Sequence, residues 1–190
     1  MWVLIDNYDS FTHILYHYLL QAGGNCRVVR NDELTLSELI LLAPERLIIS
    51  PGPGRPEQAG ITMQAIEHFF DKIPILGICL GHQALGLHYG ARLIHAPEPV
   101  HGKTDYIKHT GHPLFKEIPN PFQVMRYHSL ALNDISSSSG LLSIACTEDE
   151  TNMAVIHRQY PSVGFQAHPE SIGTPDGLQL LKNWAALFSV

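Results

Sequence analysis

The sequence is poor in the features that mark several special classes of protein. Its three cysteines, Cys26, Cys79 and Cys146, are odd in number and far apart, which excludes a disulfide framework and is typical of a reducing compartment. Basic residues are outnumbered, with 12 Lys and Arg against 18 Asp and Glu, so we expect no nucleic-acid partner. No apolar run approaches the roughly 20 residues of a membrane-spanning helix, and the opening "MWVLIDNYDS" lacks the basic-then-apolar pattern of a signal peptide. We therefore expect a cytoplasmic globular protein with no membrane partner.

Histidine, in contrast, is abundant, with 12 among the 190 residues, so metal binding has to be considered. Neither an H-E-x-x-H motif nor a cysteine pair at zinc-finger spacing occurs. His109 and His112 flank a predicted turn, and His82 and His88 lie six residues apart. We interpret the histidines as surface or core residues and expect no metal site and no cofactor.

The hydrophobic pattern of the first ninety residues alternates between strand and helix. Short apolar runs predict strands at 2–6, 26–30, 46–50 and 73–78. Helical periodicity predicts helices at 10–24, 35–43, 61–72 and 81–90. Thr35 and Glu38 predict a capping box at the second helix. Strict alternation requires crossover connections, and so a mostly parallel sheet with helices on both faces.

From about residue 91 the pattern changes to short strand-like segments, and it ends in an amphipathic stretch at 176–188. The serine run at 136–140 is interpreted as a surface loop. Neither a linker nor an internal repeat divides the chain. The sequence therefore predicts a single domain over residues 1–190, with an α/β, flavodoxin-like doubly wound fold whose strand-rich C-terminal half extends the sheet.

A first candidate for chemistry is "GICLGHQALG", residues 77–86, which follows a predicted buried strand. Cys79 lies two residues after Gly77 and two before Gly81, the spacing of a nucleophile elbow with cysteine in place of serine. The glycines would remove Cβ atoms where strand and helix pack closely, and the helix N-terminus would favour the thiolate. The alternative is a core cysteine beside two packing glycines.

A second candidate is "QAHPES", residues 166–171, after the last predicted strand. In extended backbone, side chains at i and i+2 point to the same side, so His168 and Glu170 would project together, with Pro169 holding the segment extended. Such a pair supplies the base and the base-orienting carboxylate that a thiol nucleophile needs. The alternative is an exposed strand end with a surface histidine and glutamate, which the presence of Cys79 makes less favoured.

A third candidate is "SPGPG", residues 50–54, whose prolines and glycines fix a turn with bare backbone N–H groups. Acyl transfer needs donors at the oxyanion, and removing one costs about 10²–10³ in rate. The N–H groups of Gly54 and of Leu80, the residue after Cys79, are the natural pair. The alternative is a rigid turn with only a structural role.

The motifs "PGPG", "GICLGHQ" and "HPES", in this order, closely resemble those of the class I glutamine amidotransferases. Within that family, "LIDNYDSFT" (4–12), "HGKT" (101–104) and "RYHSL" (126–130) are similar to the small subunit, component II, of anthranilate synthase or aminodeoxychorismate synthase. The resemblance spans the whole chain. It implies a glutaminase that frees ammonia from L-glutamine and delivers it to a large, chorismate-binding synthase subunit, component I.

The resemblance also implies roles for single residues. Cys79 would attack the glutamine amide and form a glutamyl thioester, with His168 as acid and then base, and Glu170 orienting His168. The oxyanion would be held by the N–H groups of Gly54 and Leu80. The residues implied to bind glutamine are Gly52, Pro53, Gly54, Gln83, Ser129 and Leu130.

The family further suggests that the loop at 7–10, and a segment with His101 and Lys103, face the synthase subunit. Ser10 in that loop is also expected to cap the first helix. Two residues depart from the family pattern: Ala167 stands where a bulky aromatic is usual, and Arg55 where a small polar residue is more common. Ala167 is expected to point into packing, and neither departure removes a triad member.

Two other functions compete with this interpretation. One is a thiol-based redox or hydrolytic enzyme on the same scaffold without a partner, which would need neither Gln83 nor the "YHSL" pocket. The other is an inactive scaffold subunit, disfavoured because all three triad positions are intact. The glutaminases of GMP synthetase and carbamoyl phosphate synthetase share the triad but lack the "DNYDSFT" opening. The product, anthranilate or aminodeoxychorismate, stays open.

Overall fold

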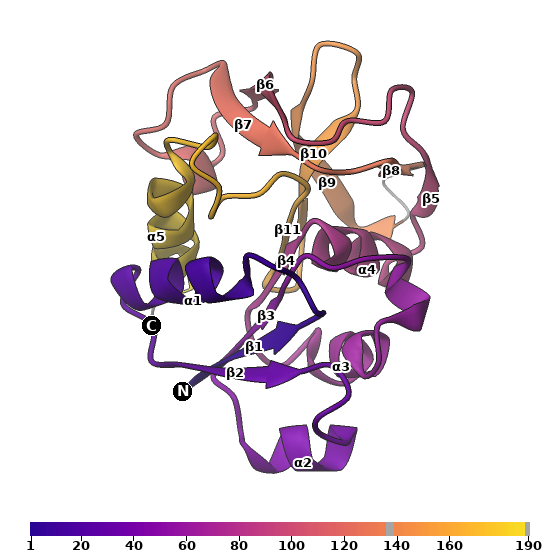
Figure 1. Ribbon diagram of the computed structural model, residues 1–190, viewed down its shortest axis with the longest axis vertical. Helices are drawn as coiled ribbons and strands as arrows, with labels where there is room; N and C mark the ends of the chain where they lie inside the picture. Colours follow the sequence, from indigo (N-terminus) through magenta and orange to yellow (C-terminus); the bar gives the residue numbers. More distant parts are fainter. Residues whose placement is uncertain (136–138, 189–190) are drawn as a thin grey trace.

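The computed structural model describes residues 1–135 and 139–188 of the chain (Figure 1). The predicted serine loop at 136–140 lies mostly outside the described residues. The strands are β1 (Trp2–Asp6), β2 (Cys26–Arg30), β3 (Arg46–Ile49), β4 (Ile75–Ile78), β5 (Arg92–His95), β6 (Lys103–His109), β7 (Phe122–Arg126), β8 (Leu130–Asn133), β9 (Leu141–Cys146), β10 (Asn152–His157) and β11 (Ser162–Phe165). The helices are α1 (Thr12–Gln21), α2 (Leu36–Leu41), α3 (Thr62–Phe69), α4 (Leu80–His88) and α5 (Gly177–Leu187), with short 3₁₀ turns η1 (Pro56–Gln58) and η2 (Pro113–Phe115).

Nine strands of the described chain form one sheet, in the order β2-β1-β3-β4-β11-β10-β9-β6-β7. The pairs among β2, β1, β3, β4 and β11 are parallel, which is the flavodoxin-like order, and the sheet continues from β11 to β7 in antiparallel pairs. The predicted doubly wound fold and its extension by the C-terminal half are thus confirmed. β5 departs from this plan, because it pairs with β8, a strand not predicted from the sequence, in a separate two-stranded sheet.

Helices cover both faces of the parallel strands because the strand side chains alternate. On β1, Leu4 belongs to a buried cluster with Leu15 of α1 and Trp184 of α5. The neighbouring Ile5 faces the opposite way, into a cluster with Ile66 of α3 and Leu85 of α4. Figure 1 shows α1 and α5 on one side of these strands and α3 and α4 on the other. The strands that carry the site are therefore buried on both faces.

The first residues of helices α2 and α1 test the capping interactions predicted from the sequence. The capping box of α2 is present, with Thr35 accepting from the Glu38 N–H and the Glu38 side chain accepting from the Thr35 N–H. The expectation that Ser10 caps α1 is wrong. Phe11 is the residue before that helix, and no side chain caps it. The Phe11 N–H donates to the carboxylate of Asp9, so Asp9 rather than Ser10 accepts a backbone hydrogen bond in this turn.

Among the described helices, none combines the length and the apolar character needed to cross a membrane.

Candidate active site

The candidate residues gather at the carboxyl ends of the parallel strands, where an open α/β sheet binds ligands. Asn7 follows β1 and Cys79 follows β4, while His168 comes three residues after the end of β11. The first loop is fixed to the loop after β3, because the Asn7 N–H and side-chain amide donate to the hydroxyl and carbonyl oxygens of Ser50. Gly52 of that loop lies so close to Asn7 that a Cβ on Gly52 would stand 2.5 Å from the Asn7 Cβ. Segments far apart in sequence thus form one rim.

Cys79 has the strained backbone of a nucleophile elbow. Its φ of 50° and ψ of −101° lie in a region that non-glycine residues rarely adopt, between the end of β4 and the first residue of α4. A Cβ on Gly77 would lie 2.2 Å from the carbonyl oxygen of Gly81, and a Cβ on Gly81 would lie 2.5 Å from that of Ile49. The two glycines therefore allow helix α4 to begin immediately behind the thiol.

His168 and Glu170 form a buried pair. The Nδ1 atom of His168 lies 2.6 Å from Oε1 of Glu170, and its Nε2 atom has no hydrogen-bond partner in the described structure. Burial lowers the pKa of His168, but interactions with Cys79 and Glu170 outweigh burial and raise this pKa to about 11. Cys79 and His168 line the same cavity, and Nε2 of His168 is left free to exchange a proton there. The arrangement provides a nucleophile, a base and a carboxylate that orients the base.

The His168–Glu170 pair forms in a backbone conformation different from the one predicted from the sequence. The strand ends at Phe165, and Pro169 and Glu170 lie in a turn in which the Ser171 N–H donates to the His168 carbonyl. The expected extended backbone over 168–170 is wrong, because Pro169 fixes φ at a value that a turn also accepts. The turn still brings Glu170 against Nδ1 of His168.

A cavity of about 160 Å³ opens beside the thiol. Its lining consists of Gly52, Pro53, Gly54, Cys79, Leu80, Gln83, Tyr127, His128, Ser129 and Leu130. All six residues expected to bind glutamine thus surround one space with Cys79 and Leu80. Gly54 has a φ of +76°, a left-handed conformation that favours glycine.

A sequence profile of the family described as "Glutamine amidotransferase class-I" matches residues 3–187. The chain belongs to this family. Aminodeoxychorismate synthase component 2 of Serratia marcescens is 47% identical to this amidotransferase over 189 residues, covering 97% of the chain and 98% of the relative. Anthranilate synthase component 2 of Pyropia yezoensis is 45% identical over 185 residues, covering 97% of the chain and 98% of the relative.

The bifunctional protein TrpGD of Thermotoga maritima is 42% identical over 184 residues, which are 96% of this amidotransferase but only 31% of that protein's length. Among solved structures, a putative GMP synthase subunit from Thermoplasma acidophilum aligns with a TM-score of 0.85 at 23% identity, over 97% of this chain and 92% of that one. This likeness shows the amidotransferase fold.

The two departures from the family pattern lie outside the cavity beside Cys79. Ala167 is fully buried in the core cluster that contains Phe165 and Trp184, so it points into packing as expected. Arg55 is exposed and forms an ion pair with Glu57, and it does not line the cavity beside Cys79 of this amidotransferase.

A second, wider cavity of about 490 Å³ meets the site at Cys79 and His168. It is lined by Tyr8, Asp9, Ser10 and Phe11 of the first loop and by His101 and Tyr127, among others. His101, which was expected from the sequence to face the synthase subunit, belongs to this lining. Lys103 is exposed on β6 and does not line this cavity. Cys79 of this amidotransferase therefore lines two cavities.

Sequence reasoning missed several residues of the site. Tyr127 packs edge-on against the His168 ring, with 5.0 Å between ring centroids, and also contacts Phe11. Gln166 places its side-chain amide nitrogen 3.6 Å from the sulfur of Cys79. Both stand inside the quoted motifs "RYHSL" and "QAHPES", so the signal for them was present in the sequence.

Proposed function

We propose that this chain is the glutaminase subunit, component II, of an anthranilate or aminodeoxychorismate synthase, with Cys79, His168 and Glu170 as its catalytic triad. The observation that carries the proposal is the buried His168–Glu170 pair near a strained cysteine at a helix N-terminus, which lines a cavity of about 160 Å³. Its near full-length similarity to component 2 proteins of both synthases supports the same assignment. We also propose that residues 1–190 form one amidotransferase domain.

The reaction follows from the positions of the groups. The thiolate of Cys79 attacks the side-chain amide carbon of glutamine, and the N–H groups of Leu80 and Gly54 hold the oxygen that becomes negative. The protonated Nε2 of His168 gives its proton to the amide nitrogen as the C–N bond breaks, which releases ammonia and leaves a glutamyl thioester. His168 then takes a proton from water, which attacks the thioester and frees glutamate and the thiolate.

Substrate recognition follows from how Gln83 is held. Its side-chain nitrogen donates to the Leu130 carbonyl at 3.2 Å and to Oε1 of Gln166 at 3.1 Å. Both amide hydrogens of Gln83 are therefore engaged inside the protein. Gln83 meets the substrate with its carbonyl oxygen, which suits the α-ammonium group of glutamine.

The wider cavity supports a partner that delivers ammonia onward. Tyr8 and Phe11 line this cavity and are partly or largely exposed, at 51% and 36%. Ile172, two residues after Glu170, is 97% exposed. Large apolar side chains so exposed beside a catalytic site are typical of a surface that another protein covers. We propose that this partner is the large synthase subunit.

The direct test is to trap the thioester. We expect acid-quenched samples of the chain incubated with glutamine to carry a glutamyl adduct on Cys79, and Cys79→Ala to release no glutamate. Cys26→Ser is the matched control, because burial raises the pKa of the Cys26 thiol to about 11 and keeps it unreactive. An adduct on another residue, or glutamate release by Cys79→Ala, would overturn the proposal.

A further inference from the structure

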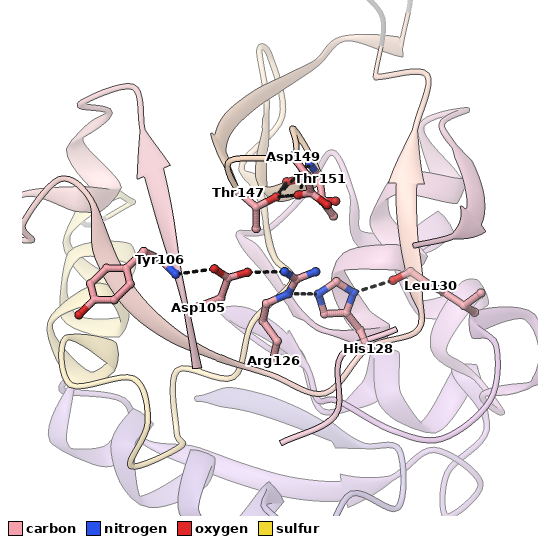
Figure 2. Close-up of polar contacts among 8 residues, drawn as sticks. All are labelled: Asp105, Tyr106, Arg126, His128, Leu130, Thr147, Asp149 and Thr151. Carbon is pink, nitrogen blue, oxygen red and sulfur yellow. Dashed lines mark hydrogen bonds and ion pairs between the residues drawn. The ribbon is translucent and has the colours of Figure 1, made fainter. Parts of the chain in front are cut away.

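A line of hydrogen-bonded polar groups runs from the strands β6 and β7 to Leu130, which lines the cavity of about 160 Å³ beside Cys79 (Figure 2). Asp105 on β6 forms an ion pair with Arg126, the last residue of β7, and its other oxygen accepts from the Tyr106 N–H. The Nε atom of Arg126 donates to Nε2 of His128 at 3.0 Å, and Nδ1 of His128 lies 2.9 Å from the Leu130 carbonyl. Leu130 lines the cavity, so the line reaches the site.

From Leu130 the line continues to the nucleophile. The Leu130 carbonyl also accepts from the side-chain nitrogen of Gln83, which donates in turn to Oε1 of Gln166. The remaining end of the Gln166 amide, Nε2, donates to the sulfur of Cys79 at 3.6 Å. Gln166 has no exposed surface, so this contact is shielded from water.

The direction of every bond in this line is set by groups that have only one role. A guanidinium can only donate, so His128 must accept at Nε2 and donate from Nδ1. A backbone carbonyl can only accept, so Gln83 must turn its nitrogen toward Leu130. Gln166 then accepts from Gln83 at Oε1 and is left with N–H groups facing the sulfur. The opposite amide orientation would direct an oxygen lone pair at the thiolate.

We propose that Gln166 is the hydrogen-bond donor that holds the Cys79 sulfur, and that Arg126 and His128 are positioning residues which hold the Leu130 carbonyl, against which the amides of Gln83 and Gln166 are oriented. This inference rests on the proposed glutaminase function and deepens it. A donor at the sulfur stabilises the thiolate before attack and keeps it pointed at the cavity, while His168 handles the proton from the other side.

The surroundings of Arg126 fit this role. Arg126 is only 4% exposed, and its charge is balanced by Asp105 and by Asp149, which lies nearby in the turn formed with Thr147 and Thr151 (Figure 2). Burial, together with the charge of Arg126, lowers the pKa of His128 to about 4, so His128 is neutral at pH 7 and keeps its acceptor nitrogen. Burying an arginine costs desolvation free energy. Here the Nε–H of Arg126 donates to Nε2 of His128 and so fixes the His128 tautomer that carries its proton on Nδ1.

The first experiment measures the reactivity of the Cys79 sulfur, as the rate at which iodoacetamide alkylates it at pH 7. Gln166→Met keeps the length of the side chain and removes the donor, and we expect alkylation and kcat/KM for glutamine to fall about tenfold or more, the effect of losing a hydrogen bond to a charged group. Gln166→Glu, when ionised, presents only acceptors and a negative charge, and both rates are then expected to fall at least as far. Asn183→Leu is the matched control, since it removes a buried amide on helix α5 that donates to the Leu114 and Lys116 carbonyls, far along the chain from Cys79.

The second experiment tests the positioning residues. His128→Asn retains a donor near the position of Nδ1, whereas His128→Leu removes it. We expect His128→Leu to raise KM for glutamine and slow alkylation, and His128→Asn to restore both in large part, with circular dichroism and thermal unfolding reporting the folded fraction of each variant. A merely structural role would lower thermal stability in both variants without this rescue.

Wild-type alkylation in folded Gln166→Met and Gln166→Glu would overturn the inference, as would equal losses in the two His128 variants. The variant Cys79→Ala distinguishes a failure of the proposed glutaminase function from a failure of the inference about Gln166. If Cys79→Ala still hydrolyses glutamine, the glutaminase mechanism fails. If Cys79→Ala is inactive while the Gln166 variants behave as wild type, only the inference about Gln166 fails.

Discussion

Substituting alanine for Gly81 tests whether close packing behind the nucleophile is a catalytic requirement. The added Cβ would stand 2.5 Å from the carbonyl oxygen of Ile49 and 2.9 Å from the Ile49 Cβ. These are atoms of the backbone and of a buried strand, which cannot rotate away. Ordinary contact begins near 3.4 Å, so helix α4 and strand β3 must separate by about 0.9 Å at this point.

Gly81→Ala is expected to lower the catalytic rate much more than the free energy of unfolding. Overpacking of this kind costs about 1–3 kcal/mol, and alanine in place of glycine within a helix offsets about 1 kcal/mol of that cost. We therefore expect Gly81→Ala to lose at most about 2 kcal/mol of unfolding free energy. The same separation moves Cys79 and the Leu80 N–H relative to the substrate, and a displacement near 1 Å lowers a rate by about a hundredfold.

The assay is glutamate release from glutamine together with urea unfolding of the same samples. Gly86→Ala is the matched control in the same helix, because the atoms nearest to its Cβ, at 2.3–2.8 Å, belong to the Leu132 side chain, and displacing that side chain leaves strand β3 in place. We expect Gly86→Ala to keep its activity. A folded Gly81→Ala with wild-type turnover, or equal activity losses in both variants, would refute the reasoning about the elbow.

Three further outcomes are expected. Glu170→Gln keeps an acceptor for His168 but removes the charge that helps to raise the His168 pKa, so kcat/KM should fall about ten- to a hundredfold, and the alkaline limb of its pH profile should move to lower pH. An unchanged alkaline limb would contradict this role of Glu170. Ile172→Glu should weaken binding of the large synthase subunit by about tenfold or more in calorimetry, because an apolar side chain loses its burial, while glutamate release by the chain alone stays the same. The isolated chain should hydrolyse glutamine slowly and faster when the synthase subunit is added, and full turnover without the partner would argue against coupling of the two sites.

Much of the fold was predictable because its signals are local. The strands β1 to β4 are short apolar runs between helical patterns, and Thr35 with Glu38 marks a helix start within four residues. The elbow at Cys79 was equally local, since the flanking glycines report how closely strand and helix must pack. β8 was missed because two of its four residues, Ala131 and Asn133, are of types depleted in strands, and its pairing with β5 defines it.

The remaining part of the site depends on contacts that no sequence window contains. Gln166 lies 87 positions from Cys79, and Gln83 lies 47 from Leu130, so their hydrogen bonds appear only once the sheet is assembled. Ser10 was assigned as a cap because serine favours that position, but the residue that precedes the helix is Phe11, whose N–H donates to Asp9. The roles of the side chains that line the cavity are therefore set by topology rather than by local preference.

The reconstituted synthase tests whether Cys79 supplies the ammonia, with chorismate as the acceptor and either anthranilate or aminodeoxychorismate as the product measured. With Cys79→Ala in the small subunit, we expect amination from glutamine to be lost while amination from added ammonium ions continues at the wild-type rate. Continued amination from glutamine would contradict the role of Cys79, and loss of amination from both sources would contradict the division of the reaction between two subunits.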